Sequence, residues 1–134
     1  MLRSLVGSEM CIRDRYHVRQ DQLLLPDGSD GVYNVVTRPQ GAAFAIPVLE
    51  TGKIVLIQHY RHTVGEWVWE VPAGGIKEHQ SPQEAATAEL QEEIGGSTQD
   101  IRYLGYFYTA VGFCDETCHI YICLLYTSPS PRDS

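Results

Sequence analysis

Three glutamates near the middle of the chain have the type and spacing to do chemistry. Glu89, Glu92 and Glu93 lie in segment 82–94, which has the sequence pattern of a helix. At about 100° per residue they form an acidic stripe directly beside the apolar stripe, at the edge of the face that would be buried. Like charges four residues apart cost a few tenths of a kcal/mol in an isolated helix. Carboxylates gathered there indicate a Mg²⁺ or Mn²⁺ site, although a solvated glutamate face has the same pattern.

The helix that must carry these carboxylates is well defined by its ends. Ser81 is placed as the N-cap, Pro82 takes the first helical position and Glu84 completes a capping box. Gly95 and Gly96 end the helix in the left-handed conformation that glycine adopts readily. The expected apolar stripe consists of Ala86, Leu90 and Ile94.

A glycine-containing loop precedes the helix. Gly74 and Gly75 begin it, and it turns through His79 before the helix starts. Such a loop exposes its backbone next to a helix N-terminus, where anions are favoured. This stretch before the helix therefore strengthens the indication of a metal site.

Strand-like runs lie on both sides of this helix. Two hairpins are expected, one across the turn at 26–31 and a second, more central one across 50–53. A short strand at 67–69 should end before Pro72, which has no amide hydrogen to donate. These elements predict an α/β or α+β sandwich with a mixed sheet. The remaining expected strands are His17–Leu25, Val32–Thr37, Ala42–Leu49, Ile54–His59, Ile101–Thr109 and Thr117–Ile122.

From Gly74 to Gly96 the chain closely resembles the Nudix box, G-x5-E-x7-R-E-U-x-E-E-x-G-U, in which U is a bulky aliphatic residue. The matching positions are Gly74, Glu89, Leu90, Glu92, Glu93 and Gly95. The departures are Gln80 for the first Glu, Ala88 for the Arg and Gly96 for the last aliphatic residue.

The resemblance continues outside the box, in 41–43, 58–61, 69–74 and 112–116. These stretches are similar to the ADP-ribose and nucleoside-diphosphate-sugar pyrophosphatase branch of the Nudix family. The resemblance implies an α/β fold, the Nudix α/β/α sandwich with mixed β-sheet and an N-terminal β-hairpin extension, assembled as a homodimer. It also implies metal-dependent hydrolysis of a small-molecule nucleoside diphosphate sugar, giving AMP and ribose 5-phosphate from ADP-ribose.

The resemblance also implies roles for individual residues. Glu89, Glu92 and Glu93 would be the catalytic residues and would hold Mg²⁺, with Mn²⁺ as the alternative, together with the carbonyl of Ala73. The expected substrate-binding residues are Arg61, Glu70, Gly112 and Glu116. For Arg61 a surface ion pair is the alternative, and for Glu70 an additional metal contact.

The departures from the family pattern affect affinity and substrate choice. Gln80 and Ala88 remove two charges that support the metal site in the family, and such losses commonly cost 10- to 100-fold in affinity or activity. Restoring both, as Gln80→Glu with Ala88→Arg, should tighten Mg²⁺ activation. Val111 stands where ADP-ribose hydrolases typically carry a proline, so sugars of the GDP-mannose type are the next candidates. In this branch the general base is usually a glutamate located after residue 122, which this chain is expected to lack.

The two ends of the chain show a pattern of another kind. The DNA string ctc gtg ggc tcg gag atg tgt ata aga gac encodes Leu5 to Asp14, and its reverse complement, read one frame over, encodes Leu124 to Arg132. This resembles a translated sequencing adapter of the transposon type. We therefore expect residues 1–15 and 123–134 to be non-native ends and residues 16–122 to be a truncated Nudix domain.

Composition excludes some classes of function. The net charge is −7, from 17 acids against 10 Lys and Arg, and no basic patch is found. This argues against nucleic-acid binding through phosphate neutralisation. No apolar run approaches the ~20 residues that span a bilayer, so no membrane association and a cytoplasmic location are expected. Of the four cysteines, Cys11 and Cys123 fall in the suspect ends. Cys114 and Cys118 remain, and a lone C-x3-C without a second pair is a poor zinc site, so structural or incidental thiols are expected.

Two alternatives to an active enzyme stay open. The first is a Nudix-fold module that binds ADP-ribose-like metabolites without turning them over, which the uncharged Gln80 and Ala88 favour. The second is an inactive truncate of the enzyme, because missing edge strands and a missing final helix would expose apolar surface.

Overall fold

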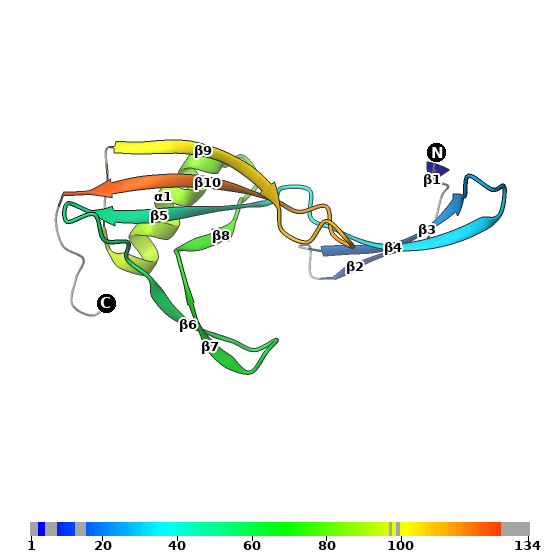
Figure 1. Cartoon of the computed structure of the whole chain (residues 1–134), viewed down its shortest axis with the longest axis horizontal. Coiled ribbons are helices and arrows are strands. Elements are labelled where there is room, and N and C mark those ends of the chain that lie inside the picture. Colours follow the sequence, from blue (N-terminus) through cyan, green and yellow to red (C-terminus); the bar gives the residue numbers. More distant parts are fainter. Residues whose placement is uncertain (1–2, 5–7, 13–15, 97, 99, 127–134) are drawn as a thin grey trace. The chain divides into compact units, whose positions relative to one another are not determined.

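The computed structural model describes residues 3–4, 8–12, 16–96, 98 and 100–126 (Figure 1). It divides into two compact units. Unit 1 comprises Met1–Pro39 with Tyr108–Thr117, and unit 2 comprises Gln40–Phe107 with Cys118–Ser134. Each unit is described by itself below.

Unit 1 is built around an antiparallel hairpin of strands β3 (Tyr16–Leu24) and β4 (Asp30–Thr37). In the turn between them, Gly28 has a φ of 87°, and the Asp27 carboxylate accepts hydrogen bonds from the amide and hydroxyl of Ser29. The predicted N-terminal hairpin is therefore confirmed, and its turn residues form it as expected.

Two short strands, β1 (Arg3–Ser4) and β2 (Ser8–Ile12), also pair antiparallel with β3. They fall in the segment for which the sequence predicts an adapter origin. That origin stays a prediction, because a strand can form whatever the source of its residues.

Unit 2 contains a four-stranded mixed sheet in the order β8-β5-β10-β9. β5 (Ala42–Leu49) runs parallel to β10 (Thr117–Leu125) and antiparallel to β8 (Ala73–Gly75). β9 (Asp100–Tyr108) forms the edge next to β10 (Figure 1). The apolar run of β5 therefore belongs to a central strand, as the sequence predicted, because both of its edges are paired.

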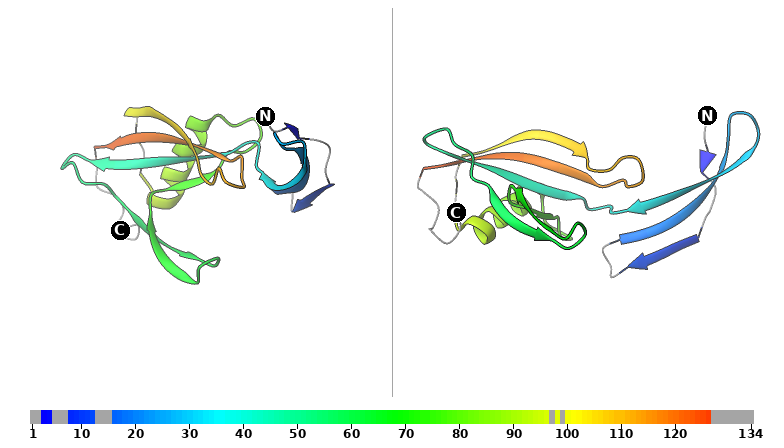
Figure 2. Two further views of the ribbon diagram at one scale, coloured as in Figure 1. Left: turned by 45° about the vertical axis from the view of Figure 1, so that its right-hand side comes forward. Right: turned by 60° about the horizontal axis from the view of Figure 1, so that its bottom comes forward.

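The helix α1 (Pro82–Ile94) covers one face of this sheet, against β5 and β8 (Figure 2). The predicted capping box is present, and Gly95 ends the helix with a φ of 76°. The buried face of α1 contains the predicted apolar stripe of Ala86, Leu90 and Ile94, and also Ala85. Helix and sheet meet in a core of Ala43, Ala45, Ala85, Ala86, Leu90, Ile94, Tyr121, Cys123 and Leu125. Within the described residues no helix is both long and apolar enough to span a membrane.

The second predicted hairpin forms only next to its turn. The Leu49 amide donates to the Lys53 carbonyl, the Val55 amide donates to the Pro47 carbonyl, and an isolated antiparallel bridge joins Val48 and Ile54, but the predicted strand 54–59 does not continue along β5. Pro47 has no amide hydrogen and so cannot donate to a continuing ladder. The same strand edge is also taken by the segment at residues 72–75, where the Ala45 amide donates to the Pro72 carbonyl at 3.0 Å. The chain instead forms a separate hairpin of β6 (Ile57–Arg61) and β7 (Glu66–Glu70), and the short predicted strand does end before Pro72.

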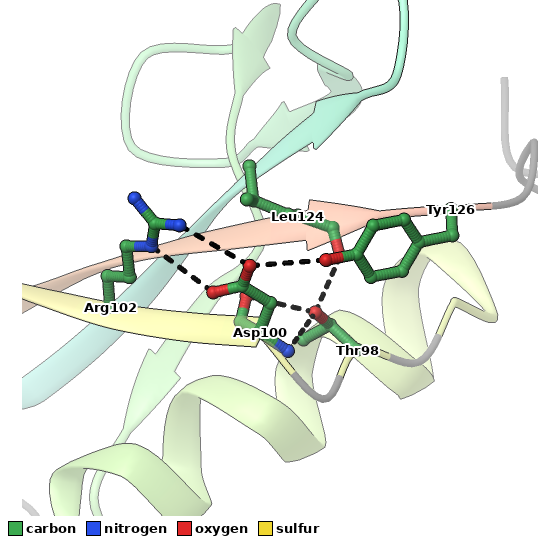
Figure 3. A network of polar contacts seen from close by, with 5 residues as sticks. All are labelled: Thr98, Asp100, Arg102, Leu124 and Tyr126. Atoms are coloured by element: carbon green, nitrogen blue, oxygen red, sulfur yellow. Dashed lines mark hydrogen bonds and ion pairs between the residues drawn. The ribbon is translucent and has the colours of Figure 1, made fainter.

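The last strand extends three residues beyond the predicted boundary at Ile122. Cys123 and Leu125 are buried in the core of unit 2. Figure 3 shows the polar network beside this strand end, where the Thr98 hydroxyl donates to the Leu124 carbonyl at 2.6 Å. The Tyr126 hydroxyl donates to Asp100 at 3.2 Å in the same network. The adapter origin of residues 123–134 stays a prediction, and residues 127–134 lie outside the described part.

Candidate metal and substrate site

The connection from β8 to α1 brings Gly74 against Glu89. A Cβ at Gly74 would overlap the Cδ and Oε1 atoms of the Glu89 carboxylate. A side chain at residue 74 would displace the Glu89 carboxylate, so the glycine lets this carboxylate approach the backbone of β8. This close approach gives the first glycine of the box a physical reason.

Glu89 and Glu93 lie one turn apart on the side of α1 that borders the core, and both are half-buried. Burial is the main cause that raises the pKa of Glu89, and the charge of Glu92 adds to it. Burial also raises the pKa of Glu93, to about 7, with a further contribution from Glu89. Glu92 itself is exposed. The predicted acidic stripe is thus a cluster in which at least two carboxylates resist ionising together.

Glu93 also has a carboxylate oxygen that accepts no hydrogen bond from the described residues. A backbone hydrogen bond from Ala73 partly offsets its pKa shift. The carboxylate oxygen Oε2 is buried without a hydrogen-bond partner in the described residues. Buried polar atoms are normally satisfied, so an orphaned carboxylate oxygen needs an explanation. A divalent cation at this position would supply one.

The available donors fit a hard cation. Glu89 and Glu93 are oxygen ligands of the kind that Mg²⁺ and Mn²⁺ prefer, and the backbone of Ala73 lies beside them. Among the described residues, no group of three or more His, Cys, Asp and Glu side chains is arranged as a complete metal site. A cation here would therefore take its remaining ligands from water, from substrate oxygens or from a moved side chain.

Arg61 ends β6 next to the hairpin turn, opposite Glu66, whereas Glu70 ends β7 at the open end of the hairpin, opposite Ile57. The Arg61 guanidinium makes two hydrogen bonds to the Glu70 carboxylate, one of them at 2.6 Å. These bonds lower the pKa of Glu70 and raise that of Arg61. Both residues also act electrostatically on Glu93, so the structure brings this pair close to the acidic cluster.

Gly112 and Glu116 lie in unit 1, in the loop 109–116. There the Gly112 carbonyl accepts a hydrogen bond from the Tyr33 hydroxyl. The Glu116 carboxylate is paired with Arg38 at 2.6 Å. The structure therefore brings the predicted site residues of unit 2 close to one another. Gly112 and Glu116 belong to unit 1, where their contacts are with Tyr33 and Arg38.

Of the positions that depart from the box, Gln80 lies in the loop before α1 and Ala88 lies on α1. The Gln80 side chain accepts a hydrogen bond from the Lys77 amide at 2.9 Å, so it stabilises the loop instead of carrying a charge. His79 adopts a φ of 64°, a left-handed conformation that is unfavourable for a residue with a side chain. Ala88 is half-buried on α1.

Sequence reasoning missed two neighbours of the site, Lys77 and His59. Lys77 partly offsets the rise that burial causes in the pKa of Glu89, and His59 adds a small contribution to the lowering of the pKa of Glu70, which the Arg61 hydrogen bond dominates. The position of Lys77 three residues after Gly74 could have suggested the first contact. Nothing in the spacing of His59 indicated the second, because it depends on the pairing of β6 with β7.

A mixed sheet, a covering helix and a carboxylate packed on a glycine define an α/β protein with a candidate cation site. The sequence model of the NUDIX domain matches residues 38–134, and the chain belongs to this family. The fold agrees, since a solved structure of an ADP compounds hydrolase superposes with a TM-score of 0.83 at 21% identity, covering 99% of this chain and 72% of that chain. The predicted α/β Nudix fold is thereby confirmed.

The curated relatives are enzymes and an activator. The chain is 32% identical over 98 residues to the ADP-ribose pyrophosphatase of Bacillus subtilis (strain 168), covering 73% of this chain and 52% of that protein. It is 33% identical over 108 residues to the ADP-ribose pyrophosphatase of Mycobacterium tuberculosis, covering 80% and 52%. It is also 33% identical over 102 residues to the methanol dehydrogenase activator of Bacillus methanolicus, covering 76% and 55%. The chain spans about half the length of these relatives.

Proposed function

We propose that the chain is the catalytic part of a pyrophosphatase that hydrolyses ADP-ribose or a related nucleoside diphosphate sugar. The observation that carries this proposal is the half-buried Glu93, whose Oε2 has no hydrogen-bond partner in the described residues, next to Glu89 packed on Gly74. Family membership and the names of two relatives support the substrate class. In the reaction, water attacks phosphorus, the bridging P–O bond breaks, and a nucleoside monophosphate and a sugar phosphate result.

We assign the cation to Glu89 and Glu93, with Glu92 and the Ala73 carbonyl as further ligands. A divalent cation bound there would neutralise diphosphate oxygens and favour attack by water. Mg²⁺ is the preferred candidate and Mn²⁺ the second, because both take oxygen ligands and retain waters.

The remaining residues bind and orient the substrate in this proposal. Arg61 would exchange one of its hydrogen bonds to Glu70 for a phosphate oxygen, since a guanidinium binds both anions through paired hydrogen bonds. Glu70 would then be available for the ribose or for a water. Gly112 and Glu116 belong to a loop that we assign to substrate binding, on the strength of the family resemblance.

The test is the formation of AMP from ADP-ribose, measured by ion-exchange chromatography with Mg²⁺, with Mn²⁺ and with a chelator. We expect cation-dependent turnover, and a loss of at least about 100-fold in Glu93→Gln, beyond what disturbed outer ligands usually cost. Glu78→Gln is the matched control, since it removes the same charge from an exposed loop position. Turnover that persists in chelator, or equal activity of the two variants, would contradict the proposal.

A second candidate is binding without turnover, which the uncharged Gln80 and Ala88 favour. It predicts that ADP-ribose raises the melting temperature while neither this chain nor a full-length parent forms AMP. Turnover by the parent alone would instead identify the chain as an inactive truncate. A panel of nucleoside diphosphate sugars that includes GDP-mannose would show whether Val111, in place of the usual proline, goes with a different preferred substrate.

Homodimer assembly of an intact parent is a further proposal, supported by the family resemblance, and sedimentation velocity on the parent would test it. The cytoplasmic location stays a prediction.

A further inference from the structure

The loop 109–116 of unit 1 is held on strand β4 by backbone hydrogen bonds. The Val36 amide donates to the Phe113 carbonyl at 2.7 Å, and the Asp115 amide donates to the Val36 carbonyl at 3.2 Å. At the base of the loop, the Thr109 amide donates to the Glu116 carbonyl at 3.1 Å. The loop is therefore attached along one residue of β4 and closed at its own base.

Arg38, just after β4, supplies the charged part of this attachment. Its backbone amide donates to the Asp115 carboxylate at 2.8 Å, and its guanidinium Nη1 donates to Glu116 Oε2 at 2.6 Å. The same guanidinium lies over the ring of Tyr16, 5.2 Å from the centroid. Arg38 thus joins both acidic residues of the loop to the β3/β4 hairpin.

The carboxylate of Glu116 is fully engaged by this arrangement. Its Oε1 accepts from the Thr109 hydroxyl at 2.9 Å while Oε2 is bound by Arg38. The Glu116 side chain is only 14% exposed, and that of Arg38 only 21%. Little of this carboxylate can reach a ligand directly, so its contacts indicate that it organises the loop.

The tip of the loop, in contrast, is apolar and exposed. Val111 is 74% exposed and Phe113 57% exposed, while the Gly112 carbonyl between them is bound by the Tyr33 hydroxyl. The polar groups of the loop therefore face its own unit, and two apolar side chains are presented outward on a fixed backbone. Loops that carry binding residues are commonly positioned by a rigid scaffold in this way.

We propose that Arg38 is a positioning residue for substrate binding: its ion pair with Glu116 fixes the 109–116 loop on β4 and thereby sets the affinity for the nucleoside diphosphate sugar. Arg38 acts through the loop and does not touch the substrate. The inference rests on the proposed function, because the assignment of this loop to substrate binding comes from there.

The first measurement is hydrogen exchange of the loop amides in the full chain. Arg38→Ala removes a charge-assisted hydrogen bond, which we expect to speed exchange at Asp115 and its neighbours on the order of tenfold. Arg102→Ala is the matched control, because it removes another arginine from an ion pair, with Asp100 on β9. Unchanged exchange in Arg38→Ala, or an equal change in the control, overturns the proposal.

The second measurement is ADP-ribose affinity, by calorimetry in chelator, together with kcat and KM in Mg²⁺. We expect Arg38→Ala to raise Kd and KM about tenfold with kcat nearly unchanged, and Arg38→Lys to recover part of the loss because it keeps the charge. A merely structural role would lower the fraction of active protein and leave KM and Kd unchanged. Normal affinity in Arg38→Ala overturns this inference alone, whereas a wild-type chain that does not bind ADP-ribose overturns the proposed function and this inference with it.

Discussion

The carboxyl group of Glu93 is held in conditions that oppose its ionisation. Burial and the charges of Glu89 and Glu70 raise its pKa to about 7, against the weaker opposing effects of Ala73 and Arg61. A carboxylate whose ionisation depends on a positive partner is suited to holding a cation. The raised pKa of Glu93 also makes the stability of the cation-free chain depend on pH.

We expect the cation-free chain to lose stability as pH rises from about 4.5 to about 7. In that window the folded state keeps the Glu93 proton while the unfolded state releases it, so the folded state binds more protons and rising pH favours unfolding. Glu93→Gln should remove this part of the slope and melt higher than wild type at pH 8. Melting temperatures in chelator from pH 5 to pH 8 measure both effects.

Glu78→Gln provides the control for this prediction, because its side chain is exposed and the slope should stay that of wild type. Parallel curves for wild type and Glu93→Gln would show that the carboxyl of Glu93 does not titrate in this range.

The contact between Gly74 and Glu89 gives a second prediction at the residue scale. In Gly74→Ala the new methyl group displaces the Glu89 carboxylate, which is the flexible end of its side chain, so we expect the fold to remain. Cation activation should weaken by about tenfold or more, the size of effect seen when groups around a metal are disturbed. Mg²⁺ titration of activity, with urea unfolding alongside, separates the two effects.

The double variant decides whether Glu89 is the cause. Added to Glu89→Ala, Gly74→Ala should weaken activation no further, since residues in contact show strong coupling. An additive loss would indicate that Gly74 acts through the backbone instead.

At the scale of elements, α1 places the carboxylates because its start is set by a capping box. The Ser81 hydroxyl accepts from the Glu84 amide at 3.1 Å, and the Glu84 carboxylate accepts from the Ser81 amide at 2.9 Å. Ser81→Ala should lower the free energy of unfolding by about 1 kcal/mol, as measured by urea unfolding.

Thr87→Ala is the matched control for the cap. The Thr87 hydroxyl donates to the Gln83 carbonyl within the same helix, and alanine has the higher helix propensity. Its stability should be unchanged or slightly higher. Equal destabilisation by both variants would mean that the cap contributes nothing specific.

At the scale of the whole molecule, the end of β10 completes the core of unit 2. Cys123 is fully buried there and burial raises its pKa to about 11, whereas Cys114 in the other unit is half-buried. We expect iodoacetamide to modify Cys114 in the native chain and to leave Cys123 unmodified until urea unfolds the protein, because the thiolate is the reactive species.

Peptide mass spectrometry would locate the modified cysteines. Rapid native modification of Cys123 would show that this strand end is not in place. The adapter origin of the ends is tested separately, by amplifying the source gene: finding residues 123–134 as genuine coding sequence would contradict it.

The sequence by itself determined the bounds of the helix. Local rules settle them, because a capping box, an N1 proline and a terminal glycine act within a few residues, and α1 begins and ends where they predict. The box spacing likewise put Glu89 and Glu93 on one side of α1 next to Gly74. The mixed sheet and the N-terminal hairpin also followed from hydrophobic patterns and turn residues.

Only the tertiary structure decided which strands pair and which charges meet. Ile57–Arg61 pairs with β7 instead of β5, because Pro47 and the segment at 72–75 leave β5 no free edge for it. The ion pair Arg61–Glu70 depends on the pairing of β6 with β7, and the ion pair Arg38–Glu116 joins residues 78 apart in the chain. The raised pKa of Glu93 depends on burial by residues distant in the chain, which no local pattern encodes.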